Sequence, residues 1–140
     1  MTDVEIGKSK TARRAYAFDD IAVIPTRRTR DPEDVSTNWG IDAFRFSLPV
    51  VAAPADSAMS PDTAIELGKL GGLGVLDLEG LWTRYEDPTQ QLNEIANAKD
   101  EDATSVLQRI YSKPIQPELI TARLKQIRDA GVTVPGALSP

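Results

Sequence analysis

The chain of 140 residues contains neither cysteine nor histidine. Without cysteine it can form no disulfide bond and offers no thiol nucleophile. Without histidine it lacks the side chain that most often serves as a general base and as a metal ligand. We therefore expect no metal site in these residues, and catalysis by a thiol or an imidazole of this chain is excluded.

Long hydrophobic runs are missing as well. The first 30 residues hold no apolar stretch that resembles a signal peptide or a membrane span, so we expect a cytoplasmic protein that does not enter a membrane. Hydrophobic residues make up 41% of the chain and charged residues 26%, which is usual for globular proteins. The length suits one domain.

Positive charge is scarce outside the first 30 residues. The net charge is −5, yet residues 1–30 hold seven basic residues and four acidic ones. The basic residues are Lys8, Lys10, Arg13, Arg14, Arg27, Arg28 and Arg30. Such an arm can contact nucleic acid or a phosphate group, or it can be a solvated segment or a subunit contact. Since no nucleic-acid-binding motif accompanies it, we expect no nucleic-acid partner.

The most informative segment is residues 48–77. Its apolar run at 48–53 predicts a buried strand. Ser60 and Pro61 predict the start of a helix over 61–70, and a Gly-Gly pair ends it before a second buried strand at 73–77. A strand, a helix and a parallel strand form a crossover unit, whose ligands bind at the carboxyl ends of the strands.

The other segments are read from similar local signals. Residues 1–15 are polar and predicted to be loosely ordered, and 18–24 are predicted to form a short strand. Residues 26–47 are predicted to be mostly loop, anchored on the core by Trp39, Phe44 and Phe46. Beyond the second strand, two short helices are predicted within 88–112, a clear helix at 117–130 and a third strand at 132–138.

Four ordered motifs carry a family resemblance. They are YAFDDIAVIP at 16–25, VST at 35–37, APADS at 53–57 and GGLG at 71–74. Together they resemble the IMP dehydrogenase / GMP reductase family, and segments 27–30 and 78–81 are similar to its bacterial IMP-dehydrogenase-related branch, which lacks CBS domains. The GGLG motif is not a dinucleotide fingerprint, because it precedes a strand instead of leading from a strand into a helix.

The resemblance implies an α/β fold that is the amino-terminal part of a (β/α)8 TIM barrel. About three strands would be present and the barrel would not be closed, since a complete barrel needs about 250 residues. Residues 1–47 would form a pre-barrel arm and strand, and 48–140 the barrel portion. We expect the chain to stop before the barrel is complete and to pair with further copies or with another chain.

The resemblance also implies a function. The complete family protein would be an NAD- or NADP-dependent oxidoreductase that converts IMP to XMP or GMP to IMP. Its chemistry uses a cysteine and phosphate-binding loops on later strands, which this sequence lacks. We therefore expect this chain alone to be inactive and to bind no NAD or NADP. The alternative is a non-catalytic accessory or binding module that pairs with another chain.

Three residues are candidates for binding the purine nucleotide, namely Ala53, Ala55 and Asp56. Ala55 stands where the family has a methionine against the base, and the smaller side chain forfeits about 1–2 kcal/mol of apolar contact. Asp56 either contacts the ligand or caps backbone N–H groups before the helix. Asp77 and Glu79 either serve in acid/base chemistry or bond backbone amides of the following loop.

Overall fold

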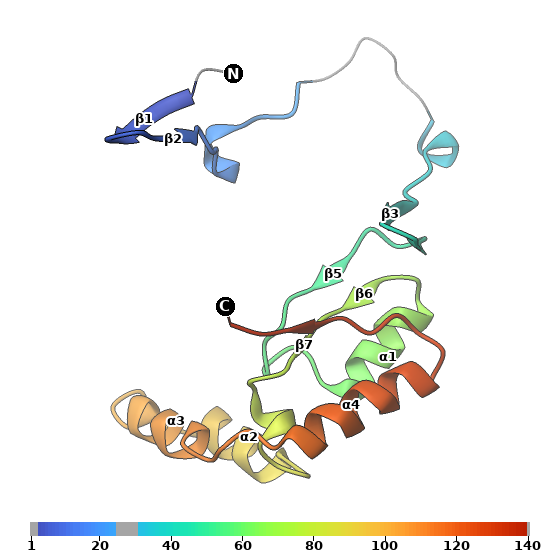
Figure 1. Ribbon diagram of the computed structural model, residues 1–140. Coiled ribbons are helices and arrows are strands. Elements are labelled where there is room, and N and C mark those ends of the chain that lie inside the picture. Colours follow the sequence, from blue (N-terminus) through green and yellow to red (C-terminus); the bar gives the residue numbers. More distant parts are fainter. Residues whose placement is uncertain (1–2, 25–30, 140) are drawn as a thin grey trace. The chain divides into compact units, whose positions relative to one another are not determined.

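The structure is a computed structural model that describes residues 3–24 and 31–139 (Figure 1). Its strands are β1 Asp3–Gly7, β2 Lys10–Arg13, β3 Trp39–Ile41, β4 Phe44–Phe46, β5 Val51–Ala52, β6 Leu73–Gly74, β7 Leu76–Asp77 and β8 Gly136–Ala137. Its α-helices are α1 Pro61–Lys69, α2 Thr89–Ala96, α3 Ala103–Tyr111 and α4 Pro117–Asp129. Three short 3-10 helices are η1 Phe18–Asp20, η2 Pro32–Asp34 and η3 Leu81–Thr83. The chain forms two compact units, Met1–Val35 and Ser36–Pro140. The boundary predicted between the pre-barrel arm (1–47) and the barrel portion (48–140) is a separate division and remains a prediction.

The first unit contains an antiparallel hairpin of β1 and β2, in which Val4 faces Ala12 across the ladder. The prediction of loose order for residues 1–15 is therefore wrong, because apolar and polar residues alternate along β1 as they do in strands. The strand predicted at 18–24 is wrong too. There the chain forms η1, since Asp20 accepts a hydrogen bond from the amide of Ala17 at 3.0 Å and holds a local turn. Arg27, Arg28 and Arg30 lie outside the described residues.

The second unit begins with the hairpin of β3 and β4, so the prediction of a loop is wrong at 39–46. The VST motif at 35–37, which stands where the family has a short strand before the barrel, does not form a strand here. Trp39 stacks on Phe46 with the ring centroids 4.6 Å apart, and its indole N–H donates to the carbonyl of Leu48 at 2.7 Å. Phe46 is buried, whereas Phe44 is 53% exposed. Trp39 and Phe46 are anchors as predicted, and Phe44 is not.

Parallel strands form the centre of this unit. β5 pairs with β6, and β7 pairs with β8. Between the two ladders, the amide of Val75 donates to the carbonyl of Ala52 at 3.2 Å, so residues 73–77 lie between β5 and β8. The predicted α/β class is confirmed, and the sheets of the described residues are not closed. Because the pairing is divided into short ladders, the count of three barrel strands remains a prediction.

Two helices cover these strands, and both were predicted. Ser60 caps α1 by accepting a hydrogen bond from the amide of Thr63 at 3.0 Å, and α4 begins at a proline. Figure 1 shows α1 and α4 side by side along the strands. The buried core that these helices share with the strands comprises Met59, Ala64, Leu76, Leu78 and Ile127. Gly71 follows α1 with a φ of 89°, a left-handed conformation that suits glycine, and turns the chain into β6.

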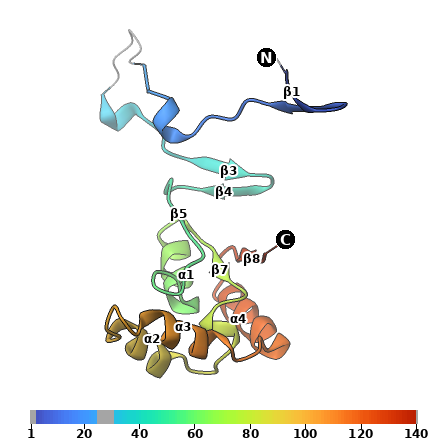
Figure 2. The same ribbon diagram turned by 90° about the vertical axis from the view of Figure 1, so that its left-hand side faces the viewer.

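A second pair of helices, α2 and α3, confirms the two helices predicted within 88–112, and the two pack against each other (Figure 2). It belongs to the connection from β7 to α4, which runs over residues 78–116. Connections from strand to helix in such folds are usually about 2–6 residues long. The structure therefore places a large insertion directly after the carboxyl end of β7.

Candidate functional site

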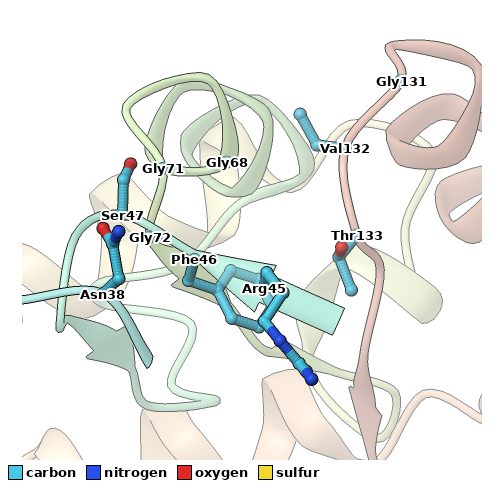
Figure 3. Close-up of a pocket in the computed structure, with 10 residues that line it drawn as sticks. All are labelled: Asn38, Arg45, Phe46, Ser47, Gly68, Gly71, Gly72, Gly131, Val132 and Thr133. Carbon is cyan, nitrogen blue, oxygen red and sulfur yellow. The ribbon is translucent and has the colours of Figure 1, made fainter. Parts of the chain in front are cut away.

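One hollow lies at the amino ends of the parallel strands and has a volume of about 550 Å³. Its lining residues are Asn38, Arg45, Phe46, Ser47, Gly68, Gly71, Gly72, Gly131, Val132 and Thr133. Figure 3 shows Asn38 and Ser47 on one side and Val132 and Thr133 on the other. Arg45 is the one charged residue among those that line this hollow. Its guanidinium donates to the carbonyls of Asp42 and Phe44 at 2.8 and 2.9 Å. That group is thus engaged in holding its own hairpin.

A second hollow, of about 700 Å³, lies at the carboxyl ends of the same strands. The strand loops contribute Ala55, Asp56, Ser57, Asp77 and Leu81 to its lining, and the helices α2 and α3 contribute Leu92, Asn93, Ile95, Ala96, Leu107 and Tyr111. Parallel α/β sheets bind ligands at this end of their strands. The carboxyl-end hollow is therefore the candidate functional site.

Asp56 joins three separate segments at this hollow. Its Oδ2 accepts hydrogen bonds from the amide of Leu81 at 2.8 Å and from the hydroxyl of Tyr111 at 2.6 Å. Its Oδ1 is buried and has no hydrogen-bond partner in the part of the chain that the structure describes. The prediction that Asp56 caps nearby backbone N–H groups before the helix is wrong, because the backbone amide that it bonds is that of Leu81, 25 residues away, and Ser60 caps α1. The carboxylate instead connects the loop after β5 to η3 and to the end of α3.

The hydroxyl of Tyr111 remains a donor in this arrangement. Burial raises the pKa of Tyr111 well above its ordinary value, and the hydrogen bond to Asp56 and the charges of Asp56 and Asp77 raise it further, against a smaller opposing effect of Arg84. A deprotonated phenol here would stand beside the carboxylate of Asp56. Tyr111 therefore stays protonated and donates a hydrogen bond to Oδ2 of Asp56.

Asp77 and Glu79 are both bonded to backbone groups. Oδ1 of Asp77 accepts from the amide of Glu79 at 2.8 Å, and Oε2 of Glu79 accepts from the amide of Ser139 at 2.8 Å and from its hydroxyl. The two bonds from Ser139 lower the pKa of Glu79 below its ordinary value. For Asp77 this is the backbone role considered from the sequence, whereas Glu79 ties down the segment after β8.

Comparison with known proteins identifies the family. A model of the IMP dehydrogenase / GMP reductase domain matches residues 15–134.

The chain belongs to the IMP dehydrogenase / GMP reductase family.

Its relatives are longer proteins. An uncharacterised oxidoreductase of Mycobacterium tuberculosis is 49% identical over 142 aligned residues, which cover 98% of this chain and 38% of the relative. An inosine-5'-monophosphate dehydrogenase of Methanocaldococcus jannaschii is 34% identical over 65 residues, which cover 46% of this chain and 13% of that enzyme. The chain thus spans 38% of the length of the uncharacterised oxidoreductase.

The fold agrees with a solved structure of the same family. The crystal structure of an IMP dehydrogenase/GMP reductase-like protein from Corynebacterium glutamicum matches with a TM-score of 0.81 and 44% identity. The match covers 99% of this chain and 38% of that one. No helix among the described residues combines the length and the apolar character needed to cross a membrane.

The family resemblance pointed to three site residues, and the structure brings two of them into the hollow. Ala55 and Asp56 line it, whereas Ala53 is exposed and lies outside its lining. The amide of Ala55 donates to the carbonyl of Ala53 at 2.9 Å, so the two residues share one tight turn. Their contact with a nucleotide remains a prediction.

Sequence reasoning missed the outer wall of the hollow. Leu92, Ile95 and Leu107 lie at helical spacing within the two short helices predicted for 88–112, and Tyr111 carries no signal of its own. This spacing was a usable signal, because the apolar face of an inserted helix packs against another part of the protein. Within residues 3–24 and 31–139, no group of three or more acidic side chains is placed to hold a metal ion.

Proposed function

We propose that residues 48–139 begin a (β/α)8 barrel of an NAD- or NADP-dependent oxidoreductase that acts on a purine nucleotide, IMP or GMP. The observation that carries this proposal is the meeting of Ala55, Asp56 and Asp77 at one hollow, where adjacent parallel strands end. Membership of the IMP dehydrogenase / GMP reductase family supports it. The activity is proposed for the complete family protein, since this chain spans 38% of its uncharacterised oxidoreductase relative.

The charge of the hollow favours the base of the nucleotide. Its lining holds the carboxylates of Asp56 and Asp77 and no lysine or arginine. A phosphate group would be repelled by these carboxylates, whereas the N–H groups of a purine can donate to a carboxylate oxygen. We therefore assign the base to this hollow and the phosphate to later parts of the barrel, where many barrels hold phosphate.

The apolar part of the lining suits a planar ring. Ala55 and Leu81 lie on the side of the strands, and Leu92, Ile95 and Leu107 lie on the side of the helices. A purine between these two sides would bury both of its faces against hydrocarbon, which is favourable at about 25 cal/mol per Å². Ala55 supplies only a methyl group to this contact, so binding by these residues alone is expected to be weak.

Chemistry is proposed for the complete protein only. These 140 residues contain no cysteine to form the covalent link on which the family reaction depends. We propose that NAD or NADP also binds through later parts of the barrel. The alternative of a non-catalytic module that pairs with another chain draws on the exposure of Val50 and Val51, which are 43% and 53% exposed. A cytoplasmic location and a homo-oligomer remain predictions.

Calorimetric titration of the chain with IMP, GMP, inosine, guanosine and ribose 5-phosphate tests the proposal. We expect at least one purine nucleotide to bind, its nucleoside to bind within about threefold of it, and ribose 5-phosphate to show no heat of binding. Equal binding of ribose 5-phosphate and nucleotide would locate the affinity at the phosphate and contradict the assignment. Absence of binding by every purine compound would contradict a base site in these residues.

A further inference from the structure

The inserted segment 78–116 supplies seven of the eleven residues that line the hollow, and hydrogen bonds within the segment tie its two ends together. Arg84 donates from Nε to the carbonyl of Glu79 at 2.9 Å and from Nη1 to the carbonyl of Tyr111 at 3.0 Å. The hydroxyl of Tyr85 donates to the carbonyl of Ile110 at 2.9 Å. These bonds hold the end of α3 to the loop after β7. They do not touch the loop that follows β5.

Among the described residues, one side-chain hydrogen bond joins the end of α3 to the loop after β5, and it runs from Tyr111 to Asp56. Among the described residues, the carboxylate of Asp56 accepts hydrogen bonds only from Tyr111 and the amide of Leu81, both at Oδ2. The next residue back is Ala55, whose carbonyl accepts from the amides of Ala58 and Met59 at 2.9 and 2.8 Å. A change in the orientation of Asp56 would therefore reach Ala55 directly.

We propose that Tyr111 is a positioning residue for the nucleotide site: through Asp56 it fixes the loop 53–57 and makes the inserted helices α2 and α3 a defined wall of that site. This inference rests on the proposed function for its ligand. It assigns to the insertion a role in selecting the ring that enters the hollow. Tyr111 acts through Asp56 and Ala55, and the proposal does not require its hydroxyl to touch the ligand.

The chain offers a matched control for the test. Tyr111→Phe removes the hydroxyl that bonds Asp56, and Tyr85→Phe removes a hydroxyl that bonds Ile110, the residue before Tyr111. Both variants loosen the end of α3 by one hydrogen bond, and both keep the ring. Only the first variant releases Asp56. We expect the two melting temperatures to fall by similar amounts, within about 4 °C of each other.

Two readouts then separate positioning from general stability. Amide hydrogen exchange at Ala58 and Met59, whose amides bond the carbonyl of Ala55, should accelerate about tenfold in Tyr111→Phe and stay unchanged in Tyr85→Phe. The dissociation constant for the purine nucleotide that binds should rise about tenfold in Tyr111→Phe, which corresponds to about 1.4 kcal/mol, and less than twofold in Tyr85→Phe.

These measurements distinguish failure of the inference about Tyr111 from failure of the proposed function. If the unmodified chain binds no purine compound, the proposed function is contradicted, and the exchange rates still decide whether Tyr111 fixes the loop. Equal exchange at Ala58 and Met59 in both variants would overturn the inference, whatever the affinities. Faster exchange with unchanged nucleotide affinity would also overturn it, because the loop would then move without consequence for the site.

Discussion

The backbone of Gly80 lies directly against the carboxylate of Asp56. A Cβ atom placed on Gly80 would stand 2.5 Å from Oδ1 and 2.8 Å from Oδ2, closer than atoms approach without repulsion. This contact packs the loop after β5 onto the loop after β7, so the two strand ends meet at residue 80. It also explains why Oδ1 of Asp56 is buried although it has no hydrogen-bond partner.

Gly80→Ala should therefore destabilise the chain by about 1–3 kcal/mol, because the added methyl group must displace the carboxylate or the loop. Thermal or urea unfolding measures the loss. Gly7→Ala is the control, since nothing lies within 4 Å of a Cβ placed there, and its effect should stay within about 0.5 kcal/mol. Equal effects of the two changes would contradict the contact.

The proposed place of Ala55 against the purine base gives a prediction of increased affinity. Ala55→Met should strengthen binding of the purine nucleotide by about 1–2 kcal/mol, or roughly 5- to 30-fold, because more apolar surface packs on the ring. Titration calorimetry measures the change. Ala58→Met makes the same substitution three residues away, outside the lining of the hollow, and should leave the affinity unchanged. An unchanged affinity in Ala55→Met would remove Ala55 from the base site.

The local parts of this fold were predictable from the sequence. The start of α1 at Ser60 and Pro61 and the end of α4 before Gly131 follow from capping preferences that act over a few residues. The polar composition of residues 1–15 predicts loose order, whereas the alternation of Val4 and Ile6 with acids fits the hairpin of β1 and β2 that forms. Polar composition and strand alternation are compatible on an exposed hairpin.

The site was predictable only in part. The loop 53–57 could be placed at a strand end, because a strand and helix pattern fixes which end of the sheet it reaches. Tyr111 could not be placed, because it meets Asp56 across 55 residues of chain. That meeting depends on how α2 and α3 fold back, which no local signal records.

The outer edge of β5 is expected to mediate association. Val50 and Val51 are 43% and 53% exposed beside backbone groups that pair with β6 on one side only among the described strands. Such an edge is a template for pairing with another strand. Val51→Lys should therefore reduce the association of the chain at high concentration, measured by light scattering.

Leu70→Lys is the matched control for the edge. Leu70 is 70% exposed at the end of α1 and is not part of β5, so its replacement removes apolar surface without altering β5. We expect Val51→Lys to lower the average mass and Leu70→Lys to leave it unchanged. A monodisperse monomer before any substitution would show instead that the residues form their own closed core.

The 140-residue chain should show no oxidoreductase turnover. It lacks a cysteine for the covalent step of the family reaction. Incubation with IMP and NAD, and with GMP and NADPH, followed by the absorbance of the reduced nicotinamide, should match a protein-free blank. Turnover clearly above that blank would contradict the proposal that catalysis needs later parts of the barrel.

The most direct measurement of the central claim is a map of amide chemical shifts during titration with IMP and GMP. The two hollows lie at opposite ends of the same strands, so the map separates them. The account predicts shifts at Ala55, Ser57 and Leu81 of the carboxyl-end hollow, and none at Ser47, Gly71 and Thr133 of the amino-end hollow. Shifts confined to the amino-end residues would contradict the assignment of the purine site to the carboxyl ends of the strands.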